Sequence, residues 1–260
     1  MDARQELPIA VLDSGVGGIS VLGELVRIMP QENYIYFGDS QNAPYGSKSK
    51  SEVLELTKKN LAALKERGIK ALVIACNTAT SAAVRVLREE NPELIIVGIE
   101  PAIKPAAEIC EKPRVLVMAT ALTLREEKFK LLVNRFLGKG EFIPLPCHGL
   151  VELIEQGDCE SDEIDEYLAK LFAPYKNEKI DGIVLGCTHY PHVRSMIAKH
   201  FPADVKIIDG GEGTARNTKR KLLEAGLLRD ENSEQGGKIE IINTSSDEKM
   251  IEISKKLLYR

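Results

Sequence analysis

The chain has 260 residues, of which 43% are hydrophobic and 28% charged, so it can bury a sizeable globular core. A formal net charge of −4 gives no electrostatic reason to expect a nucleic acid or an anionic membrane as a partner. The polar first residues lack the apolar segment of a signal peptide, and no apolar run approaches the ~20 residues of a membrane helix. The 5 cysteines have no regular spacing that would indicate a disulfide framework. We therefore expect a cytoplasmic protein with free thiols.

Short apolar, β-branched stretches alternate with amphipathic stretches along the chain. The stretch 51–66, for example, places its apolar residues on one side and its lysines and glutamates on the other, which predicts a helix. This alternation predicts an α/β protein with mostly parallel sheets, in which ligands bind at the carboxyl ends of the strands. The predicted strands are Ile9–Leu12, Tyr34–Phe37, Ala71–Ala75, Leu94–Ile99, Val115–Met118, Glu141–Leu145, Gly182–Leu185, Val205–Ile208 and Ile239–Ile242.

A glycine-rich turn, Asp13-Ser14-Gly15-Val16-Gly17-Gly18, follows the first predicted strand. It is not a dinucleotide fingerprint, because Ser20 occupies the place of the third glycine, and it lacks the Gly-Lys-Ser/Thr ending of a Walker A loop. Asp13, Ser14 and the N–H groups of the turn suit the ammonium and carboxylate groups of a small amino acid. A plain tight turn, in which Asp13 or Ser14 caps the following helix, is the alternative.

The stretches 71–76 and 182–187 resemble each other, since each runs through apolar residues to a cysteine and continues into a polar turn with threonine. This repeat indicates two similar units, although any two strand–turn–helix units share much of the pattern. Cys76 and Cys187 each stand between a predicted strand and a predicted helix, where N–H groups and the helix dipole lower a thiol pKa from about 8.5. Cys110 and Cys159 lack this context, and we interpret them as small hydrophobic residues.

Two thiols suit the inversion of a Cα centre, because one face must lose a proton while the opposite face receives one. Asp13 is the expected proton-transfer partner of Cys76, and His189 that of Cys187. Zinc chemistry is an alternative, since Cys187, His189 and His192 lie close in sequence and Cys147-His148 stands elsewhere, but no Cys-x-x-Cys or His-Glu-x-x-His spacing is present. Pyridoxal phosphate, the usual racemase cofactor, also stays open, because its lysine has no reliable local signature.

Four stretches together resemble glutamate racemases, in the family's order and over essentially the whole chain. The resemblance implies interconversion of L- and D-glutamate, which supplies D-glutamate for peptidoglycan cell-wall synthesis, without a cofactor or a metal. We also expect a homodimer on this basis. The stretches are Asp13–Gly18, Gly38-Asp39-Ser40 with Pro44-Tyr45-Gly46, Cys76-Asn77-Thr78-Ala79 and Gly186-Cys187-Thr188-His189-Tyr190-Pro191.

The same resemblance implies two similar three-layer α/β domains related by pseudo-symmetry, with the active site in the cleft between them. The first domain would comprise residues 1–98 and 210–260 and carry Cys76. The second, residues 99–209, would be inserted into the first and carry Cys187.

The resemblance also assigns roles to individual residues. Cys76 would be the acid/base for D-glutamate and Cys187 that for L-glutamate, with Asp13, His189 and Glu155 assisting. The substrate contacts implied are Asp13, Ser14, Pro44, Tyr45, Gly46, Asn77, Thr78, Thr188 and His189, to which Thr120 and Thr123 are added because they keep their spacing where the family's glycines are missing. The chain also departs from the family pattern at Cys147-His148 and at 209–212, and we expect none of these departures to touch the two thiols.

Two further alternatives remain. Related racemases that act on aspartate or hydantoins share the paired cysteines, but they lack the Asp13-Ser14-Gly15 opening, and the aspartate enzymes carry an acidic residue at the position of His189. Both features favour glutamate. A non-catalytic, two-lobed amino-acid-binding protein would need a cleft and a glycine-rich turn, but it would have no use for two thiols.

Overall fold

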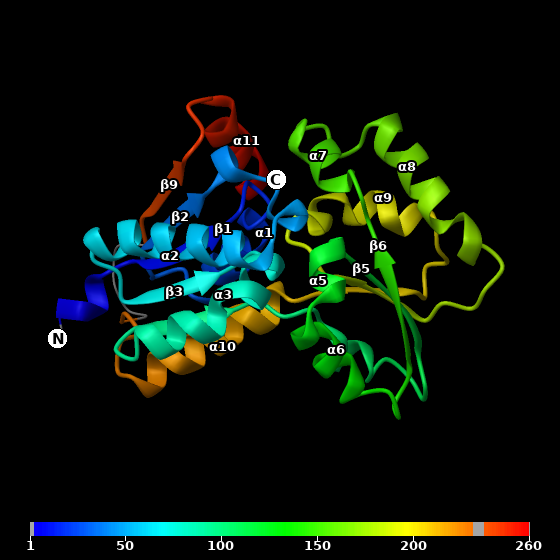
Figure 1. The fold of residues 1–260 in the computed structure, drawn as a ribbon, viewed down its shortest axis with the longest axis horizontal. Helices are drawn as coiled ribbons and strands as arrows, with labels where there is room; N and C mark the ends of the chain where they lie inside the picture. Colours follow the sequence, from blue (N-terminus) through cyan, green and yellow to red (C-terminus); the bar gives the residue numbers. More distant parts are fainter. Residues whose placement is uncertain (1–2, 231–236, 260) are drawn as a thin grey trace. The chain divides into compact units, whose positions relative to one another are not determined.

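The computed structural model describes residues 3–230 and 237–259. The chain divides into two compact units, residues 1–100 with 211–260 and residues 101–210, each with its own sheet (Figure 1). The chain therefore leaves unit 1 after Glu100 and returns to it at Gly211, beside the positions 98 and 210 expected from the sequence.

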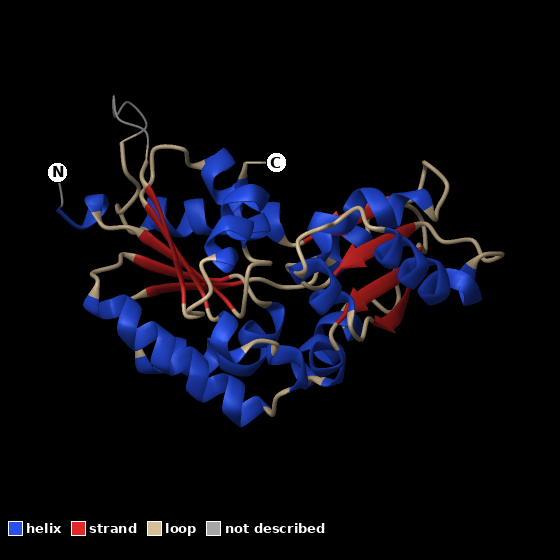
Figure 2. Cartoon of the chain, turned by 90° about the horizontal axis from the view of Figure 1, so that it is seen from above, coloured by secondary structure: helices blue, strands red, loops and turns tan. Residues whose placement is uncertain are grey.

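Unit 1 is built on a five-stranded parallel sheet with the order β4-β3-β1-β2-β9. β1, β2 and β3 are buried along their whole length, because helices lie on both sides of the sheet (Figure 2). α1 packs on α10 and α11, and α2 packs on α3. The elements are η1 (Ala3–Glu6), β1 (Ile9–Asp13), α1 (Ile19–Ile28), β2 (Tyr34–Gly38), η2 (Ser40–Asn42), η3 (Tyr45–Ser47), α2 (Lys50–Glu66), β3 (Ala71–Ile74), α3 (Asn77–Glu90), β4 (Ile95–Gly98), α10 (Gly211–Glu224), β9 (Ile239–Asn243) and α11 (Lys249–Leu258).

Unit 2 is built on a four-stranded parallel sheet with the order β6-β5-β7-β8. Its core joins α4 and α6 to β5, β6 and β7 through apolar side chains such as Ile103, Val117 and Phe129. The elements are α4 (Ile103–Ala106), β5 (Arg114–Ala119), α5 (Ala121–Arg125), α6 (Glu127–Asn134), β6 (Glu141–Pro146), α7 (Leu150–Glu155), α8 (Asp162–Phe172), η4 (Ala173–Tyr175), β7 (Gly182–Leu185), η5 (Tyr190–Val193), α9 (Arg194–Lys199) and β8 (Lys206–Asp209).

The two sheets share one strand order. β4-β3-β1-β2 of unit 1 corresponds to β8-β7-β5-β6 of unit 2, and β9 is an addition at the edge of unit 1. Cys76 follows β3 and Cys187 follows the corresponding β7. The prediction of two similar α/β domains with parallel sheets is confirmed, and the sequence repeat reflects equivalent places in the two sheets.

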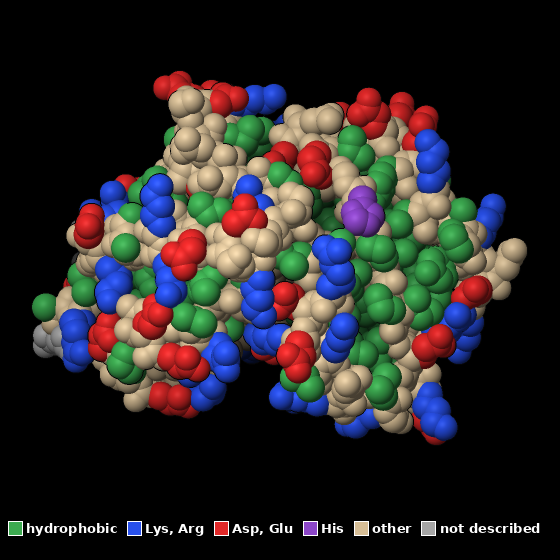
Figure 3. Space-filling model, viewed as in Figure 1, with side chains coloured by type: hydrophobic (Ala, Val, Ile, Leu, Met, Phe, Trp, Pro, Cys, Tyr) green, Lys and Arg blue, Asp and Glu red, His purple; other side chains and the backbone are tan. Residues whose placement is uncertain are grey.

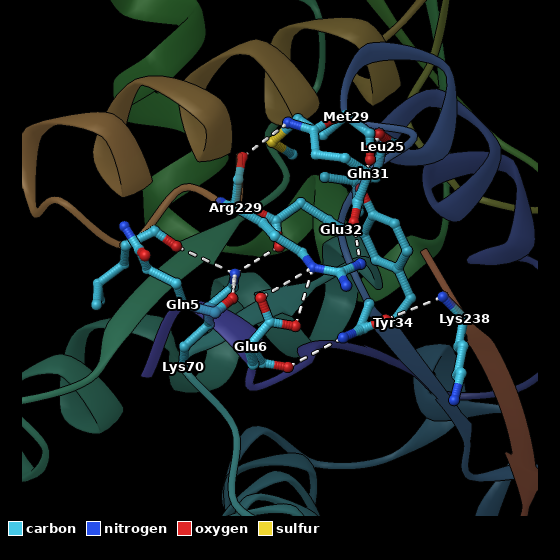
Figure 4. Close-up of polar contacts among 12 residues, drawn as sticks. Gln5, Glu6, Leu25, Met29, Gln31, Glu32, Tyr34, Lys70, Arg229 and Lys238 are labelled. Atoms are coloured by element: carbon cyan, nitrogen blue, oxygen red, sulfur yellow. Dashed lines mark hydrogen bonds and ion pairs between the residues drawn. The ribbon is translucent and has the colours of Figure 1, made fainter. Parts of the chain in front are cut away.

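A buried ion pair lies at the amino-terminal edge of the sheet in unit 1 (Figure 4). Lys70 Nζ lies 2.5 Å from Glu32 Oε2, and both side chains are 0% exposed. Lys70 also donates hydrogen bonds to the carbonyl oxygens of Gln5 and Leu227, and the backbone N–H of Arg229 donates to Glu32 Oε1. The pair thus joins the start of the chain, the start of β3 and the segment that follows α10.

The surface carries charges of both signs. On the face shown in Figure 3, lysines and arginines alternate with acidic side chains, and no large area has a single sign. In the part of the chain that the structure describes, no helix is long and apolar enough to cross a membrane. Cys159 is buried as expected, but Cys110 is exposed, because it lies in the surface connection between α4 and β5. The interpretation of Cys110 as a buried hydrophobic residue was therefore wrong.

Candidate active site

The predicted site residues of unit 1 lie at the carboxyl edge of its sheet. Asp13 ends β1, Asp39 follows β2, and Cys76 follows β3 after one intervening residue. β1 lies between β2 and β3 in the sheet, and the N–H of Ala75 donates to the carbonyl oxygen of Leu12. Asp13 therefore lies between the strand ends that carry Asp39 and Cys76.

The glycine-rich turn packs directly on Asp13. The N–H of Gly15 donates to Asp13 Oδ2 at 3.0 Å, and the Asp13 side chain is buried. A Cβ at Gly18 would stand 2.6 Å from the Cβ of Asp13, so only glycine allows this close approach. Gly18 is also the N-cap residue of α1, which has no side-chain capping hydrogen bond. The N-cap residue is thus neither Asp13 nor Ser14, and the capping role considered for them in the alternative of a plain turn is wrong.

Cys76 is the N-cap residue of α3. Its buried sulfur accepts a hydrogen bond from the N–H of Ala79 at 3.4 Å, at the positive end of the helix dipole, an arrangement that stabilises a negative charge. Asn77 and Thr78 occupy the first turn of α3 and are buried. Asn77 Oδ1 has no hydrogen-bond partner among the described residues, which leaves a buried acceptor beside the thiol.

Asp39 anchors the segment that contains Tyr45. Its carboxylate is 0% exposed and accepts four side-chain hydrogen bonds, in which the Tyr45 hydroxyl group donates at 2.6 Å. Burial acts to raise the pKa of Asp39, but the hydrogen bonds outweigh this effect and hold the pKa below its usual range. Tyr45 is buried between the half-buried Pro44 and Gly46. The other three donors are Asn42, Asn60 and Thr244.

The predicted catalytic residues of unit 2 form a chain of contacts. Cys187 Sγ lies 3.8 Å from His189 Nδ1, and His189 Nε2 lies 2.9 Å from Glu155 Oε1. Burial acts to lower the pKa of His189, but its hydrogen bonds to Cys187 and Glu155 and the negative charges of these two residues raise that pKa well above 6.5. A positively charged imidazole can therefore stabilise the Cys187 thiolate. Glu155, the last residue of α7, is the residue that holds the second ring nitrogen.

The surroundings of Cys187 differ from the prediction in one respect. No α-helix begins at this cysteine, because a turn and the 3-10 helix η5, which contains Pro191, precede α9, and α9 begins only at Arg194. The helix dipole therefore acts on Cys76 alone, and His189 supplies the compensating charge at Cys187.

The three predicted threonines of unit 2 lie at the same edge of the sheet as Cys187. Thr188 is buried directly after the thiol. Thr120 follows β5, the neighbour of β7, and caps α5, since its Oγ1 accepts from the N–H of Thr123 at 3.3 Å and donates to Thr123 Oγ1 at 3.0 Å. Capping therefore accounts for the spacing of this threonine pair.

Cys147, at the end of β6, is a third thiol at this edge. Burial raises the pKa of Cys147 to about 12; a hydrogen bond with Tyr190 opposes this rise, and the negative charge of Cys187 adds to it. Cys147 lies at the same edge of the sheet as Cys187, and the expectation that the departure at Cys147-His148 touches neither thiol stays a prediction. Because β6 and β7 lie on either side of β5 and run parallel to it, their carboxyl ends share one edge of the sheet, which sequence spacing alone did not indicate.

The cysteines and histidines of unit 2 are the metal ligands that the zinc alternative requires. Across residues 3–230 and 237–259, no three His, Cys, Asp or Glu side chains converge in an arrangement that could hold a metal ion. The ring nitrogens of His189 instead face a thiol and a carboxylate.

The chain is similar to known racemases over nearly its whole length. The model of the family described as Asp/Glu/Hydantoin racemase matches residues 10–218. A glutamate racemase from Clostridium botulinum is 48% identical over 255 residues, which cover 98% of both chains.

Solved structures give the same result. The glutamate racemase of Francisella tularensis in complex with D-glutamate has a TM-score of 0.84 at 27% identity, covering 98% of this chain and 95% of that one. The Escherichia coli glutamate racemase, in complex with L-glutamate and the activator UDP-MurNAc-ala, has a TM-score of 0.83 at 30% identity, covering 96% and 95%. The chain therefore belongs to the Asp/Glu/Hydantoin racemase family.

Proposed function

We propose that this enzyme interconverts L- and D-glutamate by a two-base mechanism without a cofactor or a metal, and that it supplies D-glutamate for peptidoglycan synthesis. One observation carries the mechanism. Equivalent strands of two similar sheets each end in a buried thiol, Cys76 or Cys187, and each thiol has its own means of stabilising a negative charge. A binding protein has no need for such a pair. The reported complexes of relatives with L- and D-glutamate support the choice of substrate.

In the direction from L- to D-glutamate, the Cys187 thiolate removes the α-proton and becomes a thiol. The electron pair of the broken C–H bond passes into the substrate carboxylate as an enediolate. The Cys76 thiol then delivers its proton to the opposite face of Cα and becomes a thiolate. The reverse reaction exchanges the two roles, so each thiol must be stable in both protonation states.

The neighbouring groups serve this exchange. At Cys187, the His189–Glu155 pair holds a positive charge beside the thiolate. At Cys76, the hydrogen bond from the Ala79 N–H and the dipole at the start of α3 stabilise the thiolate. We assign Asp13 as the residue that assists proton transfer at this thiol. The buried carboxylate of Asp13 and the unpartnered Asn77 Oδ1 suit the substrate ammonium group, while the hydroxyl groups of Ser14, Thr78 and Thr188 suit its carboxylates. We also retain Pro44, Tyr45, Gly46, Thr120 and Thr123 as substrate contacts.

Circular dichroism of wild-type enzyme with L-glutamate, D-glutamate or L-aspartate tests the reaction. We expect the signal of either glutamate enantiomer to decay to zero, and Cys76→Ala and Cys187→Ala to abolish the decay. Racemisation of aspartate but not glutamate would retain the mechanism and reject the substrate. Persistence of the activity in either variant would reject the two-thiol mechanism. Dialysis against a chelator should leave the rate unchanged.

Proton exchange in D2O separates the two thiols. Because Cys187 alone can still abstract a proton from L-glutamate, Cys76→Ala should exchange the α-proton of the L-enantiomer without forming the D-enantiomer. Cys187→Ala should show the opposite preference. Exchange of both enantiomers by one variant would contradict the assignment of one thiol to each face.

We further propose that the enzyme is a homodimer. Light scattering after size exclusion should give about twice the chain mass of 28.7 kDa. A monomer at every protein concentration would contradict this proposal.

A further inference from the structure

Unit 2 contains a pocket at the edge of its sheet opposite to the one at which Cys187 lies. The pocket has a volume of about 760 Å³ and is lined by residues that precede or begin β7 and β8, including Asp181 and Lys206. Cys187 follows the carboxyl end of β7, so the length of this strand separates it from the pocket. The proposed substrate contacts of unit 2 all lie at the carboxyl edge, and the pocket is therefore distinct from the candidate active site.

Aromatic rings form part of the apolar lining of the pocket. The rings of Phe172 and Phe201 meet edge to face at 4.7 Å between centroids, and the imidazole of His200 lies 5.8 Å from the ring of Phe172. His200 is fixed in turn, because its Nε2 lies 3.0 Å from Asp165 Oδ1. Together with the buried Ile180, these rings give the pocket a preformed apolar surface that suits a flat ligand.

The charged lining residues leave an excess of positive charge. Two of the three carboxylates in the lining already have cationic partners, since Glu178 pairs with Arg114, and Asp181 pairs with Lys179. The third carboxylate in the lining belongs to Asp204.

Three further lysines line the pocket, namely Lys176, Lys199 and Lys206. Within the ranges that the structure describes, none of the three forms an ion pair with a carboxylate; Lys199 Nζ contacts only the sulfur of Met196. The lining of the pocket therefore contains three ammonium groups without carboxylate partners, together with aromatic rings.

We propose that this pocket binds a small organic anion with a flat aromatic body. The rings would contact the aromatic part of the ligand, and the lysines would neutralise its phosphate or carboxylate, which an ammonium group binds as a point charge. The volume lies within the range of ordinary small-molecule sites. No step of the proposed racemisation uses the pocket, so this proposal stands or falls independently of the proposed function.

Calorimetric titration with phenyl phosphate, in the presence of saturating D-glutamate to occupy the substrate site, tests the proposal. We expect phenyl phosphate to bind more tightly than either inorganic phosphate or phenol, because only the complete probe uses both the lysines and the rings. The variant Lys176→Glu/Lys206→Glu should bind it at least about tenfold more weakly. Lys130→Glu/Lys139→Glu, which makes the same charge change on and just after α6, outside the pocket, is the matched control and should bind as the wild type does.

The exposed thiol of Cys110 gives a second, independent measurement, because it lies in the lining of the pocket. Phenyl phosphate should slow the alkylation of Cys110 by iodoacetamide, which peptide mass spectrometry detects, and Cys110→Ser identifies the signal. This measurement uses the wild-type fold and does not depend on the stability of the lysine variants. Equal affinity for phenyl phosphate and inorganic phosphate, or unchanged alkylation at saturating probe, would overturn the proposal.

Discussion

The carboxylate of Asp39 shows how a single buried charge can organise a site without touching a reacting atom. Asp39→Asn preserves the shape but removes the negative charge that four donors share, and the NH2 group of the amide is a poor partner for donors. We expect a loss of about 1–3 kcal/mol in the free energy of unfolding, measured in urea. The KM for glutamate should rise more than kcat falls, because Tyr45 loses its fixed position. Lys48→Met, at the end of η3, leaves the hydrogen bonds of Asp39 intact. It should change neither the free energy of unfolding nor the KM.

The lowered pKa of Asp39 predicts that the stability of the enzyme depends on pH. Because the pKa of Asp39 is lower in the folded than in the unfolded chain, its stabilising effect is present above the unfolded value of about 3.9 and is lost as the pH falls through the folded value. The stability difference between wild type and Asp39→Asn should therefore shrink below about pH 4. A difference that stays constant between pH 7 and pH 3 would show that folding does not lower the pKa of Asp39.

The raised pKa of His189 gives a second prediction at this scale. Glu155→Gln removes the carboxylate 2.9 Å from Nε2, so the pKa of His189 should fall, as measured by NMR titration of the ring protons. The stabilisation by protonated His189 is complete below about pH 6.5 and is lost as the pH rises through the folded value. In Glu155→Gln that loss should occur at lower pH.

The sequence indicated some of these residues and not others, for a physical reason. Cys76, Cys187 and His189 stand in local motifs directly after strands, where the chemistry can be inferred from neighbours in the chain. Two of the four partners of Asp39 come from α2 and from the segment after β9, and no local pattern records a hydrogen bond between residues as distant as Asp39 and Thr244. The position of Cys147 beside the site depends likewise on the order of the strands.

At the scale of elements, every strand was predicted within one or two residues of its observed ends, and for the inner strands burial on both faces explains this result. A strand covered by helices must be apolar throughout, and such runs are conspicuous in a sequence. Helix starts were harder to predict, because they depend on local hydrogen bonds. The sequence correctly indicated a helix beginning after Cys76, but not the 3-10 segment with Pro191 that delays the helix after Cys187.

The start of α1 gives a prediction with an internal control. Gly18→Ala should cost about 1–3 kcal/mol of stability and reduce activity, because the new Cβ would stand 2.6 Å from that of Asp13 and displace this side chain. Gly23→Ala lies in the same helix, where a Cβ meets nothing within 4 Å, and should stabilise the enzyme by about 0.5–1 kcal/mol. Urea denaturation and racemase assays of both variants check this contrast. Equal effects would mean that the contact with Asp13 does not require glycine at position 18.

At the scale of the whole molecule, the chain returns to unit 1 at Gly211 and runs through α10, and the ion pair of Lys70 and Glu32 contacts the segment that follows this helix. Lys70→Met leaves the Glu32 carboxylate buried without a counter-charge and removes the hydrogen bonds to Gln5 and Leu227. We expect a loss of about 3–5 kcal/mol in the free energy of unfolding.

The double variant Lys70→Met/Glu32→Gln separates the charge from the packing. It should recover part of the loss, because no uncompensated charge remains buried, while the contact to Leu227 stays broken. Lys65→Met, which removes a partly exposed ion pair with Glu93, is the control and should cost no more than about 1 kcal/mol. If Lys70→Met lowers the free energy of unfolding no more than Lys65→Met does, the buried pair does not hold the segment that follows α10. If the double variant is as unstable as the single one, the hydrogen bonds of Lys70, and not its charge, fasten that segment to the start of the chain.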